Sequence, residues 1–402
     1  MPRLAQFALF FGIVLAILGG IHFYLWARLV RDPGLVEPWR RLFTIGLCVA
    51  AAAVPVSLLL VRARPSRLGK EFVFLGMTWL GVSFFLFSAL LAADLLRLAA
   101  AAVAGTWGWL RHEPDIPADP VRRQLLARAV AGGAVLAVGG ASAVAMRTAL
   151  QDPEIHEVAV GLDRLPRSLS GFSIAQISDL HVGPTIGEAQ VRRVVQATND
   201  LRPDLIAVTG DLVDGSVASL GRAVAELGAL RARHGVYFVT GNHEYYSGVD
   251  EWIAFLRGLG MRVLRNERVA VGDGGDSFDL AGIDDWHSRG LAPGHGPDLR
   301  RALEGRDPER SLLLLAHQPK GVEAAIRSGV ELQLSGHTHG GQTFPFNLVT
   351  GIAYPYLRGL YRHEEPGRAG HVFVSRGTGY WGPPMRLGNP PEIARIVLTA
   401  GA

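Results

Sequence analysis

Two histidines one residue apart, His337 and His339, end a short apolar run and have glycines on both sides. Imidazole nitrogens bind transition metals, and alternate side chains of an extended segment point the same way. The pair could therefore serve one metal ion or two neighbouring ones. The flanking glycines let backbone and ligand approach closely. This motif alone does not define a metal site, so the interpretation depends on the polar residues upstream.

Four further groups of polar residues follow apolar runs of strand-like composition. The runs are residues 172–177, 204–209, 236–240 and 311–316. The groups that follow them are Asp179 with His181, Asp211 with Asp214, Asn242 with His243, and the single His317. Imidazole, carboxylate and amide groups thus recur at the ends of apolar strands.

The elements that must position these groups are strands that alternate with amphipathic helices after residue 150. Residues 187–201 and 217–231 are the predicted helices. The other predicted strands are residues 155–160, 278–283, 331–334, 371–374 and 393–398. Such alternation predicts a mainly parallel sheet covered by helices. Sites in these sheets lie beyond the carboxyl ends of the strands, where the polar groups stand.

The chemistry that suits this set is hydrolysis of a phosphoester by water. The reaction needs a hydroxide at neutral pH and cations that offset the phosphate charge. Two metal ions ~3.5–4 Å apart supply both, and a carboxylate between them reduces their repulsion. Imidazoles and carboxylates without thiolates favour Mn, Fe or Zn over Ca. The only cysteine, Cys48, lies in an apolar segment far upstream, so neither a thiolate site nor an internal disulfide is expected.

The motifs resemble those of the calcineurin-like metallophosphoesterase superfamily. Within it the chain looks like the membrane-attached bacterial YkuE- and YaeI-like branch and the transmembrane proteins with a metallophosphoesterase domain. The matching blocks are Asp-x-His at Asp179, Gly-Asp-x-x-Asp at Gly210, Gly-Asn-His-Glu at Gly241, the isolated His317, and Gly-His-x-His at Gly336. The resemblance covers about residues 155–400 and implies a four-layer αββα sandwich.

The resemblance also implies a role for each residue. Asp211 would bridge two divalent metal ions. The first metal would be completed by Asp179, His181 and His339, and the second by Asn242, His317 and His337. His243 would be the catalytic histidine that steadies or protonates the leaving oxygen. Asp214 would fix the tautomer and orientation of His243.

One departure from the superfamily concerns the substrate phosphate. Protein phosphatases carry an arginine after Gly-Asp-x-x-Asp, whereas this chain has Gly215 there. This weakens a protein-phosphatase reading. Arg376 and Arg386 are the candidate substrate-binding residues, although each could equally be a surface arginine.

The first third of the chain is rich in apolar residues and raises the mean hydropathy to +0.22. Four segments are long enough to cross a bilayer, which needs ~20 helical residues. They are residues 7–26, 42–61, 72–92 and 130–146. We therefore expect a transmembrane region with about four helices at residues 1–149 and a phosphoesterase domain at residues 150–402.

Arginine-rich connectors between these segments bear on topology. The first and third connectors together carry nine basic residues: Arg28, Arg31, Arg40, Arg41, Arg97, Arg111, Arg122, Arg123 and Arg128. The second connector carries Arg62, Arg64, Arg67 and Lys70. Keeping the nine inside a bacterial cytoplasmic membrane puts the phosphoesterase domain outside. Arg122-Arg123 looks like a twin-arginine export signal, although an ordinary basic flank has the same residues.

Residues 342–363 read as an irregular loop rich in aromatic and apolar side chains. They include Phe344, Phe346, Tyr354, Tyr356, Leu357, Leu360 and Tyr361. Such residues favour the membrane interface, where the loop would present a lipid-like substrate to the metals. Equally, they could pack the loop onto the domain core. Both readings stay open at this point.

The sequence thus predicts a membrane-anchored dinuclear-metal enzyme that hydrolyses phosphomonoesters or phosphodiesters with a metal-bound hydroxide. One alternative is a pyrophosphatase acting on a lipid-linked nucleotide sugar of the UDP-2,3-diacylglucosamine type, which would need a cytoplasmic site. Another is a non-catalytic metal-binding scaffold, but no residue of the set is missing. The juxtamembrane arginines inflate the pI of 9.4, so no nucleic-acid partner is expected. No obligate protein partner is evident.

Overall fold

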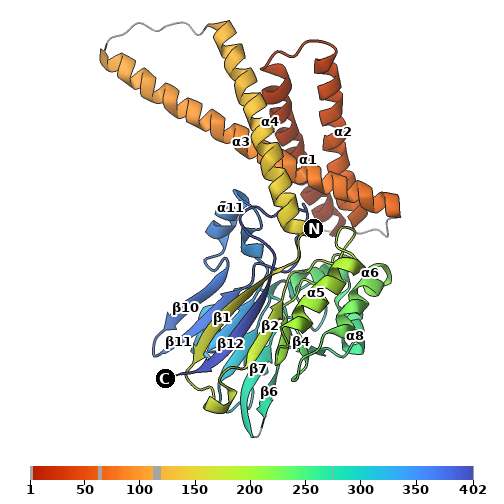
Figure 1. Cartoon of the computed structure of the whole chain (residues 1–402), viewed down its shortest axis with the longest axis vertical. Coiled ribbons are helices and arrows are strands. Elements are labelled where there is room, and N and C mark those ends of the chain that lie inside the picture. The colour runs from red at the N-terminus through yellow and green to blue at the C-terminus, as the bar shows by residue number, and fades with distance from the viewer. Residues whose placement is uncertain (1–2, 62–65, 112–118, 274, 402) are drawn as a thin grey trace. The chain divides into compact units, whose positions relative to one another are not determined.

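The computed structural model describes residues 3–61, 66–111, 119–273 and 275–401 (Figure 1). The chain divides into two compact units. The helical unit comprises Met1–Leu60 and Arg67–Val144, and the α/β unit comprises Val61–Ser66 and Ala145–Ala402. Two arginines of the second connector, Arg62 and Arg64, lie outside the described residues.

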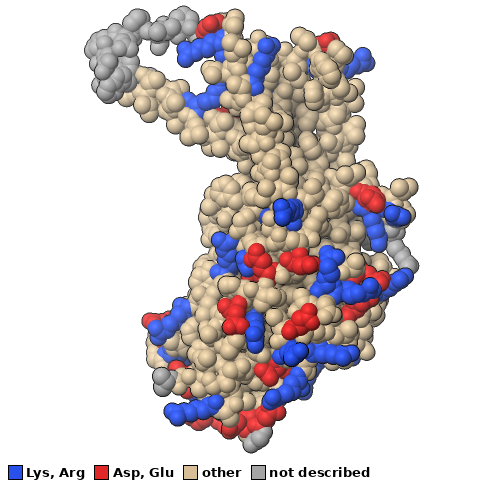
Figure 2. Space-filling view, in the orientation of Figure 1, with Lys and Arg blue, Asp and Glu red and all other residues tan. Residues whose placement is uncertain are grey.

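The helical unit contains four long helices. They are α1 (Arg3–Trp26), α2 (Trp39–Val61), α3 (Arg67–Arg111) and α4 (Pro120–Leu150), with a π-helical turn at Ala27–Arg31 after α1. Each contains a stretch long and apolar enough to cross a membrane. Figure 2 shows broad uncharged sides on these helices, whereas the α/β unit carries many charged side chains. The predicted apolar N-terminal helices are confirmed.

Helix α3 differs from the prediction because it is much longer than residues 72–92. It runs for 45 residues to Arg111, so Arg97 and the alanine-rich residues after it are helical. Alanine has the highest helix propensity, which extends the helix beyond its apolar core. The Asp94 carboxylate in α3 pairs with Arg28 (2.8 Å) and accepts a hydrogen bond from the Tyr24 hydroxyl (2.5 Å).

The α/β unit is built on two six-stranded sheets. The first has the order β1-β12-β2-β3-β4-β5, and the second has the order β10-β11-β9-β8-β7-β6. The strands of the first sheet are β1 (Glu154–Leu162), β12 (Glu392–Ala400), β2 (Ser173–Ile177), β3 (Leu205–Val208), β4 (Val236–Phe238) and β5 (Arg262–Val263). Strands β2 to β5 run parallel, and β12 is antiparallel to β2.

The second sheet has a parallel centre with antiparallel edges. Its strands are β10 (Gly359–Glu365), β11 (Arg368–Val374), β9 (Leu332–Ser335), β8 (Leu312–Leu315), β7 (Asp276–Gly282) and β6 (Glu267–Asp273). Strands β11, β9, β8 and β7 are parallel, and β10 and β6 pair antiparallel at the edges.

Four layers result because successive strand residues face opposite ways. Ile174 and Leu205 face the core between the sheets, whereas Ala175 and Ile206 face the outer helices. The helices of the α/β unit are α5 (Glu188–Asp200), α6 (Val217–Val224), α7 (Asn242–Ser247), α8 (Val249–Gly258), α9 (Leu299–Ala302), α10 (Val322–Arg327) and α11 (Phe346–Ala353). Helices α5, α6 and α8 contribute to the core on the first sheet, and α9 and α10 to the core on the second. The predicted αββα sandwich is confirmed.

Residues 342–363 are more regular than predicted. They contain helix α11 and the first residues of strand β10, which pairs with β11 from Gly359 onward. The glycines and prolines in this stretch hid both elements, because such residues usually mark loops.

Candidate metal centre

The predicted metal-binding residues all follow the carboxyl ends of strands. In the first sheet, strand β2 leads into Asp179 and His181, β3 into Asp211, and β4 into Asn242. Strands β8 and β9 of the second sheet lead into His317, and into His337 with His339. The two sheets are tied together beside this point, since the Gln176 side chain donates to Thr209 Oγ1 and to the Ser335 carbonyl (2.9 Å each).

The backbone at these strand ends is strained in a consistent way. Five of the seven predicted ligands have φ between 50° and 71°: Asp179, His181, Asp211, His337 and His339. Non-glycine residues rarely adopt this region, and those that do cluster at functional sites. The sharp turns aim the five side chains inward from the strand ends.

One group of donors comprises Asp179, His181 and His339. Their ligand atoms lie within 4.8 Å of one another. His181 Nε2 is 3.0 Å from His339 Nε2, and His339 Nε2 is 3.5 Å from Asp179 Oδ1. All three residues are buried. Two imidazole nitrogens that face each other beside a carboxylate form a donor set suited to a divalent cation.

A second group comprises Asp211, His317 and His337. His317 Nε2 lies 3.2 Å from Asp211 Oδ2 and 3.2 Å from His337 Nδ1. Asp211 Oδ2 also lies 3.9 Å from His181 Nε2, in the first group. The Asp211 carboxylate thus stands between the two groups.

Asn242 is the seventh predicted ligand, at the start of α7. Its side-chain oxygen Oδ1 is buried and has no hydrogen-bond partner among the described residues. A buried acceptor without a partner is unfavourable by about 1–3 kcal/mol. A cation bound by this oxygen would remove the penalty, so the residues present fit divalent metal.

Neighbouring groups hold the ligands in place. His317 Nδ1 donates to the Thr209 carbonyl (2.7 Å), which leaves Nε2 free to bind metal. Ser178 Oγ donates to Asp179 Oδ2 (2.5 Å), and the backbone N–H of His337 donates to both Asp179 oxygens (2.9 and 3.0 Å).

The electrostatic surroundings favour the neutral ligand form of two histidines. Burial lowers the pKa of His337 to about 3, helped by the charge of His317. Burial, with the positive charges of His181 and Arg386, puts the pKa of His339 well below its usual value. Burial also opposes a charge on His317, but the Asp211 carboxylate outweighs it and raises its pKa. Metal must therefore compete with a proton at His317.

His243 and Asp214 contact each other beside the two groups, and His243 also forms a third possible donor group with His181 and Asp211. His243 Nδ1 donates to Asp214 Oδ1 (2.5 Å), and its Nε2 lies 4.0 Å from Asp211 Oδ2. Burial lowers the pKa of His243, but the negative charges of Asp211 and Asp214 outweigh it and raise that pKa to about 9. Asp214 Oδ1 also accepts from His181 Nδ1 (3.1 Å), so one carboxylate orients two imidazoles.

Glu244 is a site residue whose role the sequence reading missed. It is completely buried, and its carboxylate accepts backbone N–H groups from Gly241 (2.6 Å), Asp211 (3.0 Å) and Leu212 (2.8 Å). Burial and the Asp211 charge raise its pKa to about 7. Glu244 thereby ties the β3 loop to the start of α7. Its place in Gly-Asn-His-Glu was the available signal.

Arg386 and Arg376, the candidate substrate-binding residues, both make contacts within the protein. Arg386 is completely buried, and its guanidinium donates to the carbonyls of Gly379, Asn389 and Arg376. The guanidinium of Arg376 is paired with the Glu392 carboxylate (2.6 Å). Both guanidinium groups thus have partners within the protein, and substrate binding by either one stays a prediction.

Close backbone approach explains one glycine of the final motif. A Cβ atom at Gly336 would collide with Ser178 Oγ and Asp179 Oδ2. The loop after β9 can therefore lie against the loop after β2 only because residue 336 has no side chain.

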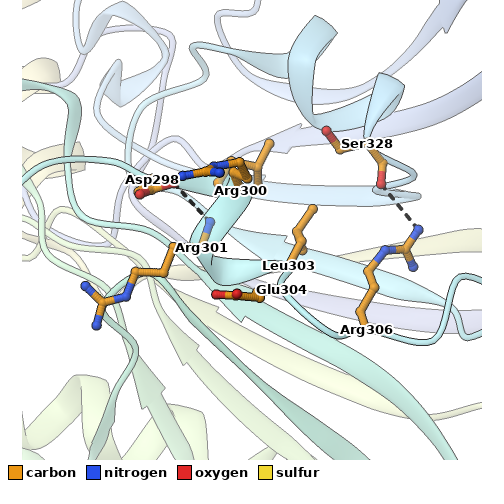
Figure 3. Close-up of a pocket in the computed structure, with 8 residues that line it drawn as sticks. Asp298, Arg300, Arg301, Leu303, Glu304, Arg306 and Ser328 are labelled. Carbon is orange, nitrogen blue, oxygen red and sulfur yellow. Dashed lines mark hydrogen bonds between the residues drawn. The ribbon is translucent and has the colours of Figure 1, made fainter.

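A pocket of about 750 Å³ lies elsewhere in the α/β unit (Figure 3). It is lined by Asp298, Leu299, Arg300, Arg301, Leu303, Glu304, Arg306 and Ser328, none of them a predicted site residue. Arg301 N–H donates to Asp298 Oδ1, and Arg306 Nη2 donates to the Ser328 carbonyl. Charges of both signs line it, and we assign it no role.

Comparison with known proteins fits this site. Residues 172–341 match the family model described as calcineurin-like phosphoesterase. A zebrafish transmembrane protein with metallophosphoesterase domain is 35% identical over 98% of this chain and 89% of its own length. The chain therefore belongs to the calcineurin-like phosphoesterase family, a class of metal-dependent phosphoester hydrolases.

Two further relatives show how far the similarity extends. The bovine transmembrane protein with metallophosphoesterase domain is 42% identical over 70% of this chain, and the match spans 64% of its length, just under two thirds. The uncharacterized metallophosphoesterase YkuE of Bacillus subtilis is 30% identical over 69% of this chain and 97% of its own. The transmembrane relatives and the four apolar helices together identify a membrane protein.

Proposed function

We propose that this protein is a membrane-anchored phosphoesterase that uses two divalent metal ions, Mn, Fe or Zn, to hydrolyse phosphomonoesters or phosphodiesters. The observation that carries the proposal is the place of Asp211. Its Oδ2 lies between His181 (3.9 Å) and His317 (3.2 Å), so one carboxylate is shared by both donor groups.

Each predicted ligand has a place in this proposal. Asp179, His181 and His339 would hold the first cation, Asn242, His317 and His337 would hold the second, and Asp211 would be shared by both. When bound, the two cations supply Lewis acidity toward the phosphoryl oxygens and activate water at neutral pH. The chain keeps the shared carboxylate in position through Asp211 Oδ1, which accepts the backbone N–H of His243 (2.8 Å).

His243 and Asp214 act on the leaving group in this proposal. The hydrogen bond from Nδ1 to Asp214 fixes the proton on that nitrogen and orients the ring. Nε2 then faces the Asp211 carboxylate at 4.0 Å and can carry a second proton toward the oxygen that leaves.

The membrane setting completes the proposal. Residues 1–149 form the transmembrane region and residues 150–402 the phosphoesterase domain, placed outside a bacterial cytoplasmic membrane. The substrate is a phosphoester with a lipid-like part. In support, the aromatic Trp381 ring, which is exposed, lies 5.9 Å from the His243 ring, and the Tyr354 hydroxyl lies 2.9 Å from His337 Nε2.

Metal removal and reloading test the proposal. The full chain in detergent, stripped by a chelator, should lose hydrolysis of nitrophenyl phosphate and bis(nitrophenyl) phosphate. Titration with Mn, Fe(II) or Zn should restore it, with about two equivalents bound at full activity. Restoration by Ca alone would contradict the donor chemistry, and full turnover by the stripped protein would refute the proposal.

The side of the membrane is tested by a separate prediction. In intact bacterial spheroplasts we expect protease to cleave the α/β unit and alkaline phosphatase fused after Ala402 to be active, because the nine basic residues stay inside. Arg122→Lys with Arg123→Lys should block export if the pair is a twin-arginine signal and change nothing if it is an ordinary flank. Protection until lysis would invert the topology and favour the lipid-precursor pyrophosphatase.

A further inference from the structure

Helix α11 exposes an uncharged apolar surface. All eight of its residues are described and none is buried. Leu348 and Val349 are 59% and 61% exposed, Ile352 is 88% exposed, and Phe344, just before the helix, is 54% exposed. We call these four side chains the α11 face. Apolar surface exposed to water costs about 25 cal/mol per Å², so a contiguous group of this kind marks a contact with something else.

The ends of α11 are fastened although its middle is exposed. Before the helix, the Phe344 N–H donates to the Leu387 carbonyl (3.2 Å) and Gly341 lies close against Asn347. After it, Tyr356 packs against the core cluster of Val322, Ile326, Val372 and Val374. The helix is therefore held to the α/β unit at both ends, and the exposure of its face is built into the fold.

The segment beside α11 reaches the catalytic histidine. Gln342 joins this segment to residues 381–383. Its side chain donates to the carbonyls of Trp381 (2.9 Å) and Pro383 (3.3 Å) and accepts a hydrogen bond from the Trp381 N–H (2.9 Å). The Trp381 side chain is 54% exposed, and its ring lies 5.9 Å from that of His243. Trp381 thus lies beside the candidate metal centre, and Gln342 joins it to the segment that leads into α11.

The same segment holds the end of a candidate membrane helix. The last turn of α4, from Ala145, belongs to the α/β unit. The Arg386 N–H donates to the Ala145 carbonyl (2.9 Å), and Ala149 packs with Ile186 and Tyr380. This turn and α11 lie at the same end of the α/β unit (Figure 1). Residues 380–387 thereby connect α11, the catalytic site and the point where α4 enters.

We propose that the α11 face and Trp381 insert into the interfacial layer of the lipid bilayer that holds the chain. A bilayer fits better than a protein partner because residues 342–357 contain no charged side chain that could pair with one. Tryptophan, tyrosine and aliphatic side chains are favoured in that layer. If the proposed phosphoesterase function holds, the site opens at the membrane surface and takes amphiphilic phosphoesters from it.

Spin labels measure the insertion without any substrate. The full-length protein first carries Cys48→Ser. In this background Val349→Cys and Ile352→Cys are each spin-labelled in nanodiscs of phosphatidylcholine and phosphatidylglycerol. Ala254→Cys, on exposed α8, is the matched control. We expect the ratio of oxygen to nickel-complex accessibility to be several-fold higher at 349 and 352 than at 254.

Three results would overturn the insertion. Equal ratios at all three positions would mean that the face lies in water. Spin–spin broadening between copies would mean that a second chain covers it. Low accessibility to both reagents would mean that another part of the protein does.

A functional arm keeps this proposal distinct from the phosphoesterase proposal. Val349→Glu with Ile352→Glu should lower kcat/KM several-fold for a phospholipid analogue in vesicles and leave a soluble nitrophenyl ester unaffected. An equal change in kcat/KM on both substrates, from the parent protein to the variant, would count against insertion. Inactivity of the metal-loaded parent protein on both would instead count against the phosphoesterase function.

Discussion

Asp211→Asn is expected to lower turnover by roughly 10³–10⁵-fold, since the Lewis acidity of a metal is worth several kcal/mol and each 1.36 kcal/mol is tenfold. The substitution keeps the shape of the side chain but removes the negative charge between the two donor groups. Asp211 Oδ2 lies 3.2 Å from His317 Nε2 and 3.9 Å from His181 Nε2. Two cations would then repel each other across a neutral amide, so one of them should leave.

Metal analysis of the purified variant decides this prediction. We expect at most about one equivalent in Asp211→Asn and about two in the parent protein. Asp200→Asn, an exposed carboxylate of α5 that accepts from Gln196, is the matched control and should keep both metals and full activity. Two full equivalents with normal turnover in Asp211→Asn would refute the bridging role.

The strand ends were predictable because two local patterns coincide there. A parallel strand buried on both faces reads as a continuous apolar run, as at residues 312–315, and a polar group directly after it has few structural uses. The alternation of strands and helices predicts a mainly parallel sheet covered by helices, and the resemblance to the family implies the αββα arrangement of two sheets. How the loops turn was not predictable, since positive φ at Asp179 or Asp211 depends on contacts from distant segments.

What the sequence could not predict about these side chains has one physical cause: the burial of a charge cannot be read from a single sequence. Arg386 stands in a glycine- and proline-rich stretch typical of a surface loop, yet its donors satisfy carbonyls of its own loop in the interior. The Glu244 carboxylate likewise accepts hydrogen bonds from three backbone N–H groups, those of Asp211, Leu212 and Gly241. Both side chains hold backbone groups in place, a role that only the tertiary contacts reveal.

Different parts of the aromatic stretch at residues 342–363 pack differently. Tyr356 and Tyr361 pack on the core of the second sheet, as the packing reading requires. Val349 and Ile352 of α11 are exposed instead. Periodicity alone could not separate them, since proline and glycine interrupt the stretch at Pro345, Gly351 and Pro355.

His243→Ala should keep both metals yet lose ~10²–10⁴-fold in rate, the usual contribution of a general acid. The imidazole donates Nδ1–H to Asp214 at 2.5 Å and directs Nε2 toward the Asp211 carboxylate at 4.0 Å. It touches the leaving oxygen in our proposal and no metal. Removing it therefore leaves every predicted ligand in place, and His156→Ala on the exposed face of β1 should change neither quantity.

The dependence on leaving group separates this role from a role as a metal ligand. The His243→Ala loss should be largest for alkyl phosphoesters and shrink for nitrophenyl esters, whose leaving oxygen needs little protonation. Asp214→Asn should reduce metal content as well as rate, because Asp214 Oδ1 also accepts from His181 Nδ1 at 3.1 Å. Equal losses for good and poor leaving groups, or a missing metal in His243→Ala, would show that His243 binds metal instead. That outcome would fit the third donor group of the site, His181, Asp211 and His243, whose ligand atoms also lie within 4.8 Å of one another.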